Sequence, residues 1–377
     1  MTPIETLQHF NKRWGKRKEA YKAMQKNYIQ GNVKKGLFCD RGFVEGLLKE
    51  HPSELLGSYK SDIHNAWKTI DKKIGLSEEE VEEKRIQAML GHDSRVSREL
   101  AIGTQLFGTW RNSLGIYRIS DDIADQALAS PIPDDTPTII YAQLPEWAVY
   151  MEMPIGSDIE VMAILDNGDG ESVTKMLKVI GFWAMHDKHD LDKSDVGVEA
   201  DQNLSLHIFL HIDIPKEFEK SNYIGPPLVL PLRSNLTVAQ SVAEEYDHNS
   251  DNETVVVREV FGIILSLLLW LCVDEPDVSD VTGAPMSSDD LKAPKYKRSK
   301  RADVFIPPQN AQIYDIGKKL AYETREHNKK LALESGATGK KVKPHIRKGH
   351  WHGVWSGTGE NKVFSTYWQS PIFINAK

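Results

Sequence analysis

The sequence predicts an α+β fold with three parts: a helical N-terminal unit, a central and mainly antiparallel sheet packed on a buried helix, and a C-terminal helix followed by a hairpin rich in histidine and tryptophan. Apolar residues recur at helical spacing early in the chain, short β-rich runs fill residues 138–214, and residues 254–273 are apolar nearly all round. The chain has 377 residues, of which 40% are hydrophobic and 27% charged, so it can form two or three packed units.

Residues 1–130 are expected to form the helical unit, which begins with a basic arm. One apolar stripe at helical spacing consists of Ile63, Trp67, Ile70 and Ile74. A further helix is predicted over residues 94–114. Three prolines in residues 131–137 remove amide donors and fix backbone angles, so neither a helix nor a sheet can cross this segment. We therefore place a domain boundary there.

Residues 131–273 are expected to form an α+β core around an antiparallel sheet. The predicted strands cover residues 139–153, 159–165, 176–185 and 204–214. Most connections between these strands are too short to hold a crossover helix, which favours antiparallel pairing. Two helices should follow, over residues 237–246 and 254–273. The second should be enclosed by the sheet and other helices because it lacks a polar face, and its 14 uncharged residues are fewer than the roughly 20 that a membrane span needs.

Residues 274–302 are predicted to be a linker or mobile loop, because Pro, Ser, Asp and Lys are frequent and no hydrophobic periodicity is present. Residues 303–377 should then form a C-terminal helix and hairpin. The helix is predicted over residues 311–333, with Ile313, Ile316 and Leu320 facing inward.

Motifs of several enzyme classes are missing from the sequence. The chain contains no P-loop, no G-x-G-x-x-G, no H-E-x-x-H and no G-x-S-x-G, so nucleotide hydrolysis, hydride transfer, zinc proteolysis and α/β-hydrolase chemistry lack support. Cys39 and Cys272 are the only cysteines and cannot form a disulfide framework or a cysteine zinc site. We expect no cofactor, and an enzymatic activity is left open as the less favoured interpretation.

Two groups of histidines are candidate metal ligands. His186, Asp187, His189, Asp190 and Asp192 fall within seven residues and could hold a divalent ion, but the lysines among them favour a solvated acidic loop. His207 and His211 share one face of a predicted strand, where a rise of about 3.3 Å per residue places them roughly 13 Å apart, too far to chelate one ion. We therefore expect no metal site.

Charge is strongly segregated along the chain. The first 35 residues hold nine Lys or Arg against two acidic residues, residues 292–301 hold six basic residues and no acidic one, and residues 340–348 hold five and none. Because the net charge is −7, the remainder carries −25. This pattern suggests an acidic body with basic arms that could touch phosphate backbones or an acidic protein face, although short basic runs can also be merely solvated.

The C-terminal segment carries the most unusual pattern, since three of the 13 histidines and two of the nine tryptophans fall within residues 343–357. In a strand, His350 and His352 would project to one face and Trp351 to the other. Residues 357–361 should turn, and residues 362–369 should return as a second strand with Phe364 and Trp368 on one side. Three interpretations are open: recognition of bases or phosphates, acid and base catalysis by the imidazoles, or a tail that docks its tryptophans into the body.

The same segment resembles the ending of the second family of type V-A anti-CRISPR proteins, which are encoded by phages and plasmids and act against the type V-A effector nuclease. The residues that carry the resemblance are Pro344, His345, Arg347, Lys348, Gly349, His350, Trp351, His352, Trp355, Ser356 and Gly357, followed by Trp368, Pro371, Ile372, Ile374 and Asn375. The candidate binding residues that follow from this motif are His345, Arg347, Lys348, His350, Trp351, His352, Trp355 and Trp368.

The resemblance implies a protein that recognises the N-terminal peptide of the effector as it leaves the ribosome and leads to destruction of the message being translated. The partner would be that peptide, with ribosomal RNA as an expected contact of the basic segments, in the cytoplasm of the bacterial host and with no membrane or small-molecule substrate. The alternative is a protein that binds or cleaves RNA through its basic arms and His345, His350 and His352. Either role is one of macromolecular contact.

Overall fold

A computed structural model describes most of the chain, with gaps. The described residues are 1–14, 95–111, 113–166, 172–188, 204–218, 227–246, 252–273, 275–287, 290–291, 296–298, 303–305, 308–334, 345–347, 349–359, 362–369 and 372–374. The chain divides into two compact units, each drawn from several segments. The first unit comprises residues 1–114, 187–197 and 294–311, and the second comprises residues 115–186, 198–293 and 312–377.

Among its described residues, the first unit has the packed helices α1 (Pro3–Trp14) and α7 (Arg95–Trp110) and a short antiparallel pair, β8 (Tyr296–Arg298) with β9 (Asp303–Phe305). A capping box starts α1, because Thr2 Oγ1 accepts from the Glu5 amide at 3.2 Å and Glu5 Oε2 accepts from the Thr2 amide at 2.7 Å. Phe10 of α1 packs on Phe107 of α7 with ring centroids 4.9 Å apart. The predicted helix over 94–114 is confirmed, whereas the stripe from Ile63 to Ile74 lies outside the described residues.

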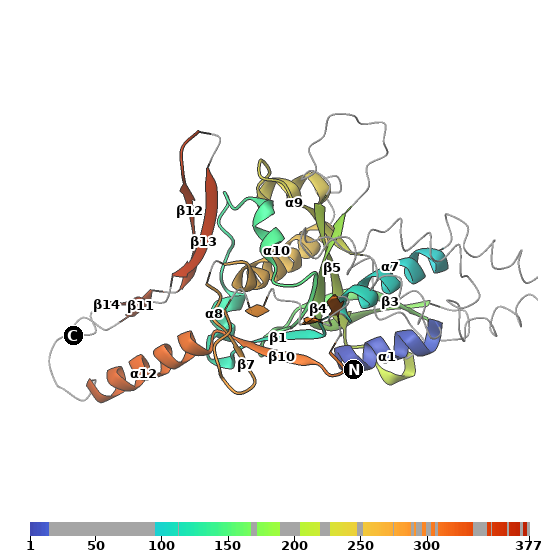
Figure 1. Ribbon diagram of the computed structural model, residues 1–377, viewed down its shortest axis with the longest axis horizontal. Coiled ribbons are helices and arrows are strands. Elements are labelled where there is room, and N and C mark those ends of the chain that lie inside the picture. The colour runs from blue at the N-terminus through green and yellow to red at the C-terminus, as the bar shows by residue number, and fades with distance from the viewer. Residues whose placement is uncertain are drawn as a thin grey trace, which may run out of the picture. The chain divides into compact units, whose positions relative to one another are not determined.

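The second unit is built on a sheet of strand order β6-β5-β4-β2-β1-β10-β7, with β3 paired to β4 (Figure 1). Its strands are β1 (Gly115–Ile119), β2 (Ala148–Glu152), β3 (Glu160–Asp166), β4 (Ser172–Lys188), β5 (Leu204–Ile212), β6 (Leu228–Pro231), β7 (Val278–Asp280) and β10 (Gln312–Ile316). Pairing is antiparallel for β2 with β4, β3 with β4, β5 with β6, and β7 with β10. The predicted α+β fold with a mainly antiparallel sheet is confirmed.

The two parallel pairs both involve β1, which lies between β2 and β10. Residues 115–119 were predicted to belong to the helical unit, and this was wrong for these residues. The connection to β2 contains η2 (Asp121–Ile123), α8 (Ala124–Leu128) and η3 (Thr138–Gln143), so it is long enough for a parallel crossover. The structure also corrects the predicted strand 139–153, whose first part is helical in η3 and whose last part is β2.

One long apolar helix, α10 (Asn252–Cys272), packs against one face of this sheet, next to α9 (Val238–Tyr246). Its middle is fully buried among residues of β1, β2, β4 and β5. Tyr141 Oη of η3 donates to the Leu265 carbonyl at 3.0 Å, which ties the crossover connection to the helix. The prediction of an enclosed helix over 254–273 is confirmed. Among the described helices, none is long and apolar enough to cross a membrane.

Two of the predicted C-terminal features are corrected. Residues 278–280, in the predicted linker, form β7 at the sheet edge, and Ile313 and Ile316 lie on strand β10 and not on a helix. The helix α12 (Lys318–Glu334) begins only after Gly317, whose φ of +78° strongly favours glycine. A Cβ at Gly317 would also collide with the Ile123 side chain. Both observations require glycine at this turn from strand to helix.

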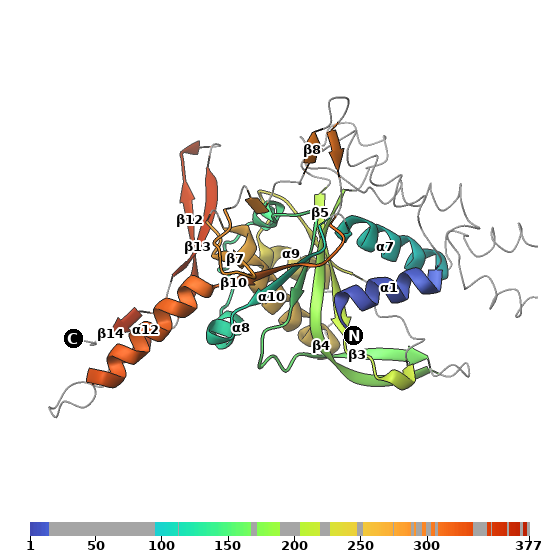
Figure 2. The same ribbon diagram turned by 60° about the horizontal axis from the view of Figure 1, so that its bottom comes forward.

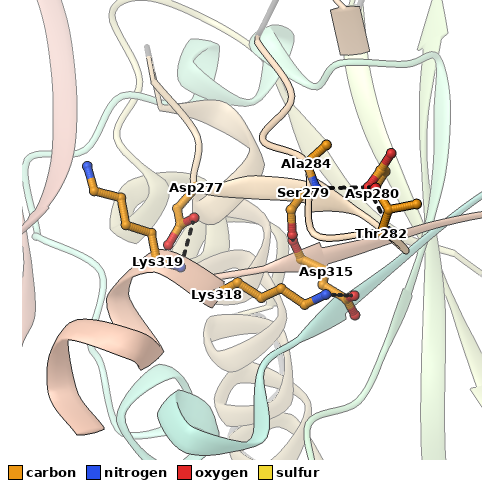
Figure 3. Close-up of polar contacts among 8 residues, drawn as sticks. All are labelled: Asp277, Ser279, Asp280, Thr282, Ala284, Asp315, Lys318 and Lys319. Carbon is orange, nitrogen blue, oxygen red and sulfur yellow. Dashed lines mark hydrogen bonds and ion pairs between the residues drawn. The ribbon is translucent and has the colours of Figure 1, made fainter. Parts of the chain in front are cut away.

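Polar contacts hold the start of α12 beside β7 (Figure 3). The Asp277 carboxylate accepts from the Lys319 and Leu320 amides at 3.3 and 3.0 Å, which satisfies orphan donors of the helix N-terminus. Lys318 Nζ pairs with Asp315 Oδ2 at 2.7 Å. In the turn after β7, Asp280 Oδ1 accepts from the Thr282 and Ala284 amides, which closes the loop (Figure 3).

Candidate binding site on the C-terminal hairpin

The C-terminal segment forms a hairpin of β12 (His350–Ser356) and β13 (Val363–Gln369), drawn in red in Figures 1 and 2. The strands are antiparallel and in continuous register from His350 opposite Gln369 to Ser356 opposite Val363. Two further short strands, β11 (His345–Arg347) and β14 (Ile372–Ile374), also pair antiparallel. The predicted hairpin is therefore confirmed.

The inner face of the hairpin packs on α10 through tryptophan. Trp351 is only 3% exposed, and its ring centroid lies 5.3 Å from that of Trp270. Trp368, opposite Trp351 in the register, lies 4.8 Å from Trp270 and 5.2 Å from Trp351. The three indoles form one cluster that buries this end of the hairpin against the core.

A hydrogen-bond chain fixes the same contact in register. Trp351 Nε1 donates to Ser266 Oγ of α10 at 3.1 Å, and Ser266 Oγ donates to the Ser130 carbonyl at 2.6 Å. Both bonds are buried, so breaking either would leave a polar atom with neither a protein partner nor water to bond to. The hairpin is thus attached at a defined position on α10, and not merely by apolar contact.

Gly353, within β12, leaves space for the Phe364 ring of β13 to lie over the strand. A Cβ at Gly353 would lie 2.5 Å from Phe364 Cζ, so the Phe364 ring occupies the space that any other residue would need. Trp355 stacks edge-on against Phe364 with centroids 5.0 Å apart. Trp355 remains 44% exposed, because it lies near the tip and beyond the contact with α10.

The outer face of the hairpin is exposed and mixes imidazole, phenol and apolar groups. His352 and Tyr367 are opposite each other, with rings edge-to-face at 5.2 Å. Tyr367 is 49% exposed and Val363 62% exposed, and Val354 is exposed as well. This face offers hydrogen-bond donors and aromatic surface to a partner, whereas the inner face is occupied by α10.

The candidate binding residues therefore divide into groups. His352 and Trp355 are exposed and His350 is half-buried, whereas Trp351 is buried and Trp368 packs beside it. His345 and Arg347 lie on β11, opposite Ile374 and Ile372. Lys348 lies outside the described residues. The predicted sorting of imidazole and Trp351 onto opposite faces is confirmed, and their role in binding stays a prediction.

The predicted solvated loop at residues 186–192 is wrong for its first two members, which are buried at the end of β4. His186 Nε2 lies 2.8 Å from the Tyr141 carbonyl oxygen, and burial lowers the pKa of His186. Asp187 Oδ1 accepts from Gln105 Nε2 at 2.8 Å. Residues 189–192 lie outside the described residues. Buried partners thus explain these polar side chains.

His207 and His211 lie on the same face of β5 and serve separate contacts. His207 Nε2 lies 3.0 Å from Ser205 Oγ, and His211 Nδ1 lies 2.8 Å from Tyr150 Oη. Burial lowers the pKa of His211 to about 3, so this imidazole is neutral at physiological pH. No group of three or more possible metal ligands occurs among the described residues.

Two features of the hairpin were missed from sequence. Its anchors on α10, Ser266 and Trp270, are about 85 residues earlier in the chain, and no local signal marks them. The exposed outer-face residues Val354, Val363 and Tyr367 could have been found by extending the two-residue alternation along both strands.

Comparisons with known proteins agree on one family. A sequence model of the anti-CRISPR type V subtype A2 family, called AcrVA2-like, matches residues 117–376. A solved structure titled "Crystal structure of AcrVA2" has a TM-score of 0.61 and 27% identity, covering 99% of this chain and 98% of that one. Among curated proteins no sequence match is found.

Proposed function

Because the chain belongs to the anti-CRISPR type V subtype A2 family, we propose that it recognises the nascent N-terminal peptide of the type V-A effector nuclease and causes loss of the effector's mRNA. The observation that carries the proposal is the family match over residues 117–376, which includes the whole C-terminal hairpin. The effect on its target would be a lowered amount of effector in the cytoplasm of the bacterial host.

The charge distribution supports contact with two kinds of partner. The three basic segments can approach ribosomal RNA, while the rest of the chain, at −25, can attract a basic peptide. An arrangement of this kind would hold the protein near the ribosome during synthesis of the effector.

The two faces of the hairpin suit two different roles, attachment to the core and contact with a partner. Trp351 and Trp368 position the strands on α10, and the outer-face pair His352 and Tyr367 is available to a partner. Aromatic side chains near a polar rim are typical of protein-binding surfaces. We propose that His352, Tyr367 and the exposed tip residue Trp355 are what the hairpin contributes to contact with a macromolecular partner.

A reporter whose message begins with the effector's first few dozen codons tests the proposal. One version is recoded with synonymous codons, so that the peptide is unchanged and the RNA differs; another is frameshifted, so that the RNA is nearly unchanged and the peptide differs. Co-expression should deplete the recoded message and spare the frameshifted one. Survival of the recoded message would refute peptide recognition.

The alternative, direct binding or cleavage of RNA, is favoured only by the basic segments and the hairpin histidines. It predicts depletion of the frameshifted message, and a binding constant for labelled RNA that falls steeply with salt. A matched pair of variants, His352→Ala on the outer face and Trp355→Ala at the tip, would then show whether the histidine itself is needed for RNA loss.

A further inference from the structure

Strand β3 forms one side of a two-stranded ribbon with the first part of β4 (Figure 2). Its register is continuous from Glu160 opposite Lys178 to Asp166 opposite Ser172, without a bulge. Among the described residues, no strand pairs with the other side of β3. A long regular edge strand of this kind is a template for another strand, and proteins usually protect such edges.

The hydrogen-bonding pattern shows which residues face the open edge. Val179 N donates to the Ile159 carbonyl at 2.9 Å, so Ile159 and Val179 are a directly bonded pair at the start of this register. In an antiparallel ladder such pairs alternate. Val161, Ala163 and Leu165 therefore bond to β4. The N–H and C=O groups of residues 160, 162, 164 and 166 point to the open edge.

Two of the exposed side chains of this ribbon are flexible methionines. Met162 is 52% exposed and lies directly opposite Met176 of β4, which is 56% exposed. The opposite face of the ribbon has its own small core of Leu165, Leu177 and Phe218. The methionine pair is thus not needed to hold the ribbon together, and flexible methionines are common on surfaces that accept varied partners.

The charges of β3 select the kind of strand that can bind. Pairing of two copies edge to edge, antiparallel and centred on Ala163, would place Glu160 of each copy opposite Asp166 of the other. Like charges directly opposite each other oppose strand pairing. An extended peptide with a cation at each end and apolar residues between would instead have its cations opposite positions 160 and 166, which are both acidic in the sequence, and an apolar residue opposite Met162.

We propose that the open edge of β3 binds an extended basic peptide by antiparallel strand addition, with the outward-facing N–H and C=O groups of residues 160–166 as its hydrogen-bond partners. The identity of that peptide as part of the nascent effector rests on the proposed function, but the binding mode does not.

A labelled synthetic peptide, Lys-Thr-Val-Thr-Val-Thr-Lys with blocked ends, probes the edge on the full-length protein by fluorescence anisotropy. Its cations fall opposite residues 160 and 166, and its valines opposite residues 162 and 164. The same peptide with Glu at both ends should bind about tenfold more weakly, because attraction at each end becomes repulsion. Equal binding of the two peptides would overturn the charge selection.

Backbone methylation of the peptide tests strand addition without altering the protein. N-methylation of the two valines removes the donors that would face β3 and should abolish binding. N-methylation of the first and last threonines alters donors that point away, so the Kd should change by less than about threefold. If the two methylated peptides bind equally well, the peptide is not added as a strand.

A matched pair of protein variants locates the site. Met162→Pro removes one outward-facing N–H and should weaken binding at least tenfold, whereas Met162→Thr keeps the N–H, loses only the apolar side chain and should weaken binding about two- to threefold. Circular dichroism and thermal unfolding verify that Met162→Pro is folded. If it is not, the methylated peptides, which are tested on the natural protein, decide whether the peptide is added as a strand. Equal binding to both folded variants would place the peptide elsewhere.

The reporter assay separates this inference from the proposed function. If Met162→Pro loses the peptide in vitro and still depletes the effector message, the function stands and β3 is not its peptide site. If the peptide binds β3 as expected but the effector message survives with the natural protein, the strand addition stands and the proposed function fails.

Discussion

Two antiparallel ribbons of the second unit are held in different ways. In the part of the chain that the structure describes, the C-terminal hairpin of β12 and β13 is held where Trp351 and Trp368 meet Trp270 and Ser266 of α10. The ribbon of β3 and β4 is continuous with the central sheet through β4 and has its own small core around Phe218. The hairpin therefore depends on a few contacts with residues distant in sequence, whereas the ribbon shares the stability of the sheet.

The largest expected effect is on the hairpin. Trp351→Ala removes a buried indole and should lower the stability of the docked hairpin by about 3–5 kcal/mol. Hydrogen exchange should accelerate throughout residues 350–369, while β3 and β4 keep their protection. Equal loss of protection in both ribbons would contradict this attachment.

Trp351→Phe is the matched control for this change. It keeps an aromatic ring beside Trp270 but loses the bond from Nε1 to Ser266 Oγ. The cost should be smaller, about 1–2 kcal/mol, because Ser266 still donates to the Ser130 carbonyl. Trp355→Ala, at the exposed tip, should leave exchange at the docked end unchanged.

Acidification should destabilise the sheet beside the ribbon. Burial lowers the pKa of His211 to about 3, against about 6.5 in the unfolded chain, so the unfolded state binds more protons between these values. Stability is therefore full above pH 6.5 and falls by about 1.4 kcal/mol per pH unit as the pH drops toward 3. Asp213 N, just beyond β5, donates to the Lys178 carbonyl, which links this strand to the base of the ribbon.

Chemical denaturation between pH 7 and 4.5, combined with hydrogen exchange, measures this dependence. His211→Asn keeps a polar atom near Tyr150 Oη but does not titrate, so its stability curve should be flatter with pH, even if the variant is less stable at pH 7. A natural protein with the same slope as the variant would show that His211 does not carry the effect.

The smallest expected effect concerns the ribbon alone. Lys175 Nζ lies 4.4 Å from the centre of the Phe218 ring, and a partly exposed cation over a ring contributes about 0.5–1 kcal/mol. Lys175→Met should cost this amount, whereas Lys175→Arg should keep it. Urea unfolding measures both, and an equal loss in the two variants would rule out a contribution from the cation.

The local sequence pattern was sufficient to predict a helix or strand where that element has its own pattern of apolar residues. The apolar run of α10, the short β-rich runs of β3 to β5, and the histidine and tryptophan alternation of β12 each predicted the element that formed. The pattern failed at Gly115–Ile119 and Gln312–Ile316, which are five residues each and too short to distinguish strand from helix. These two strands pair with each other across nearly 200 residues of sequence.

The sequence by itself determined that the C-terminal hairpin has one face of imidazoles and another of large rings, because side chains alternate along any strand. Only the tertiary structure decided which face is available. The ring face packs on Trp270 and Ser266, so His352 and Tyr367 remain outside. The same holds for the open edge of β3. A strand is at an edge when no other strand pairs with one of its sides, and among the described strands only β4 pairs with β3. Burial and strand pairing depend on distant segments, which a local pattern does not contain.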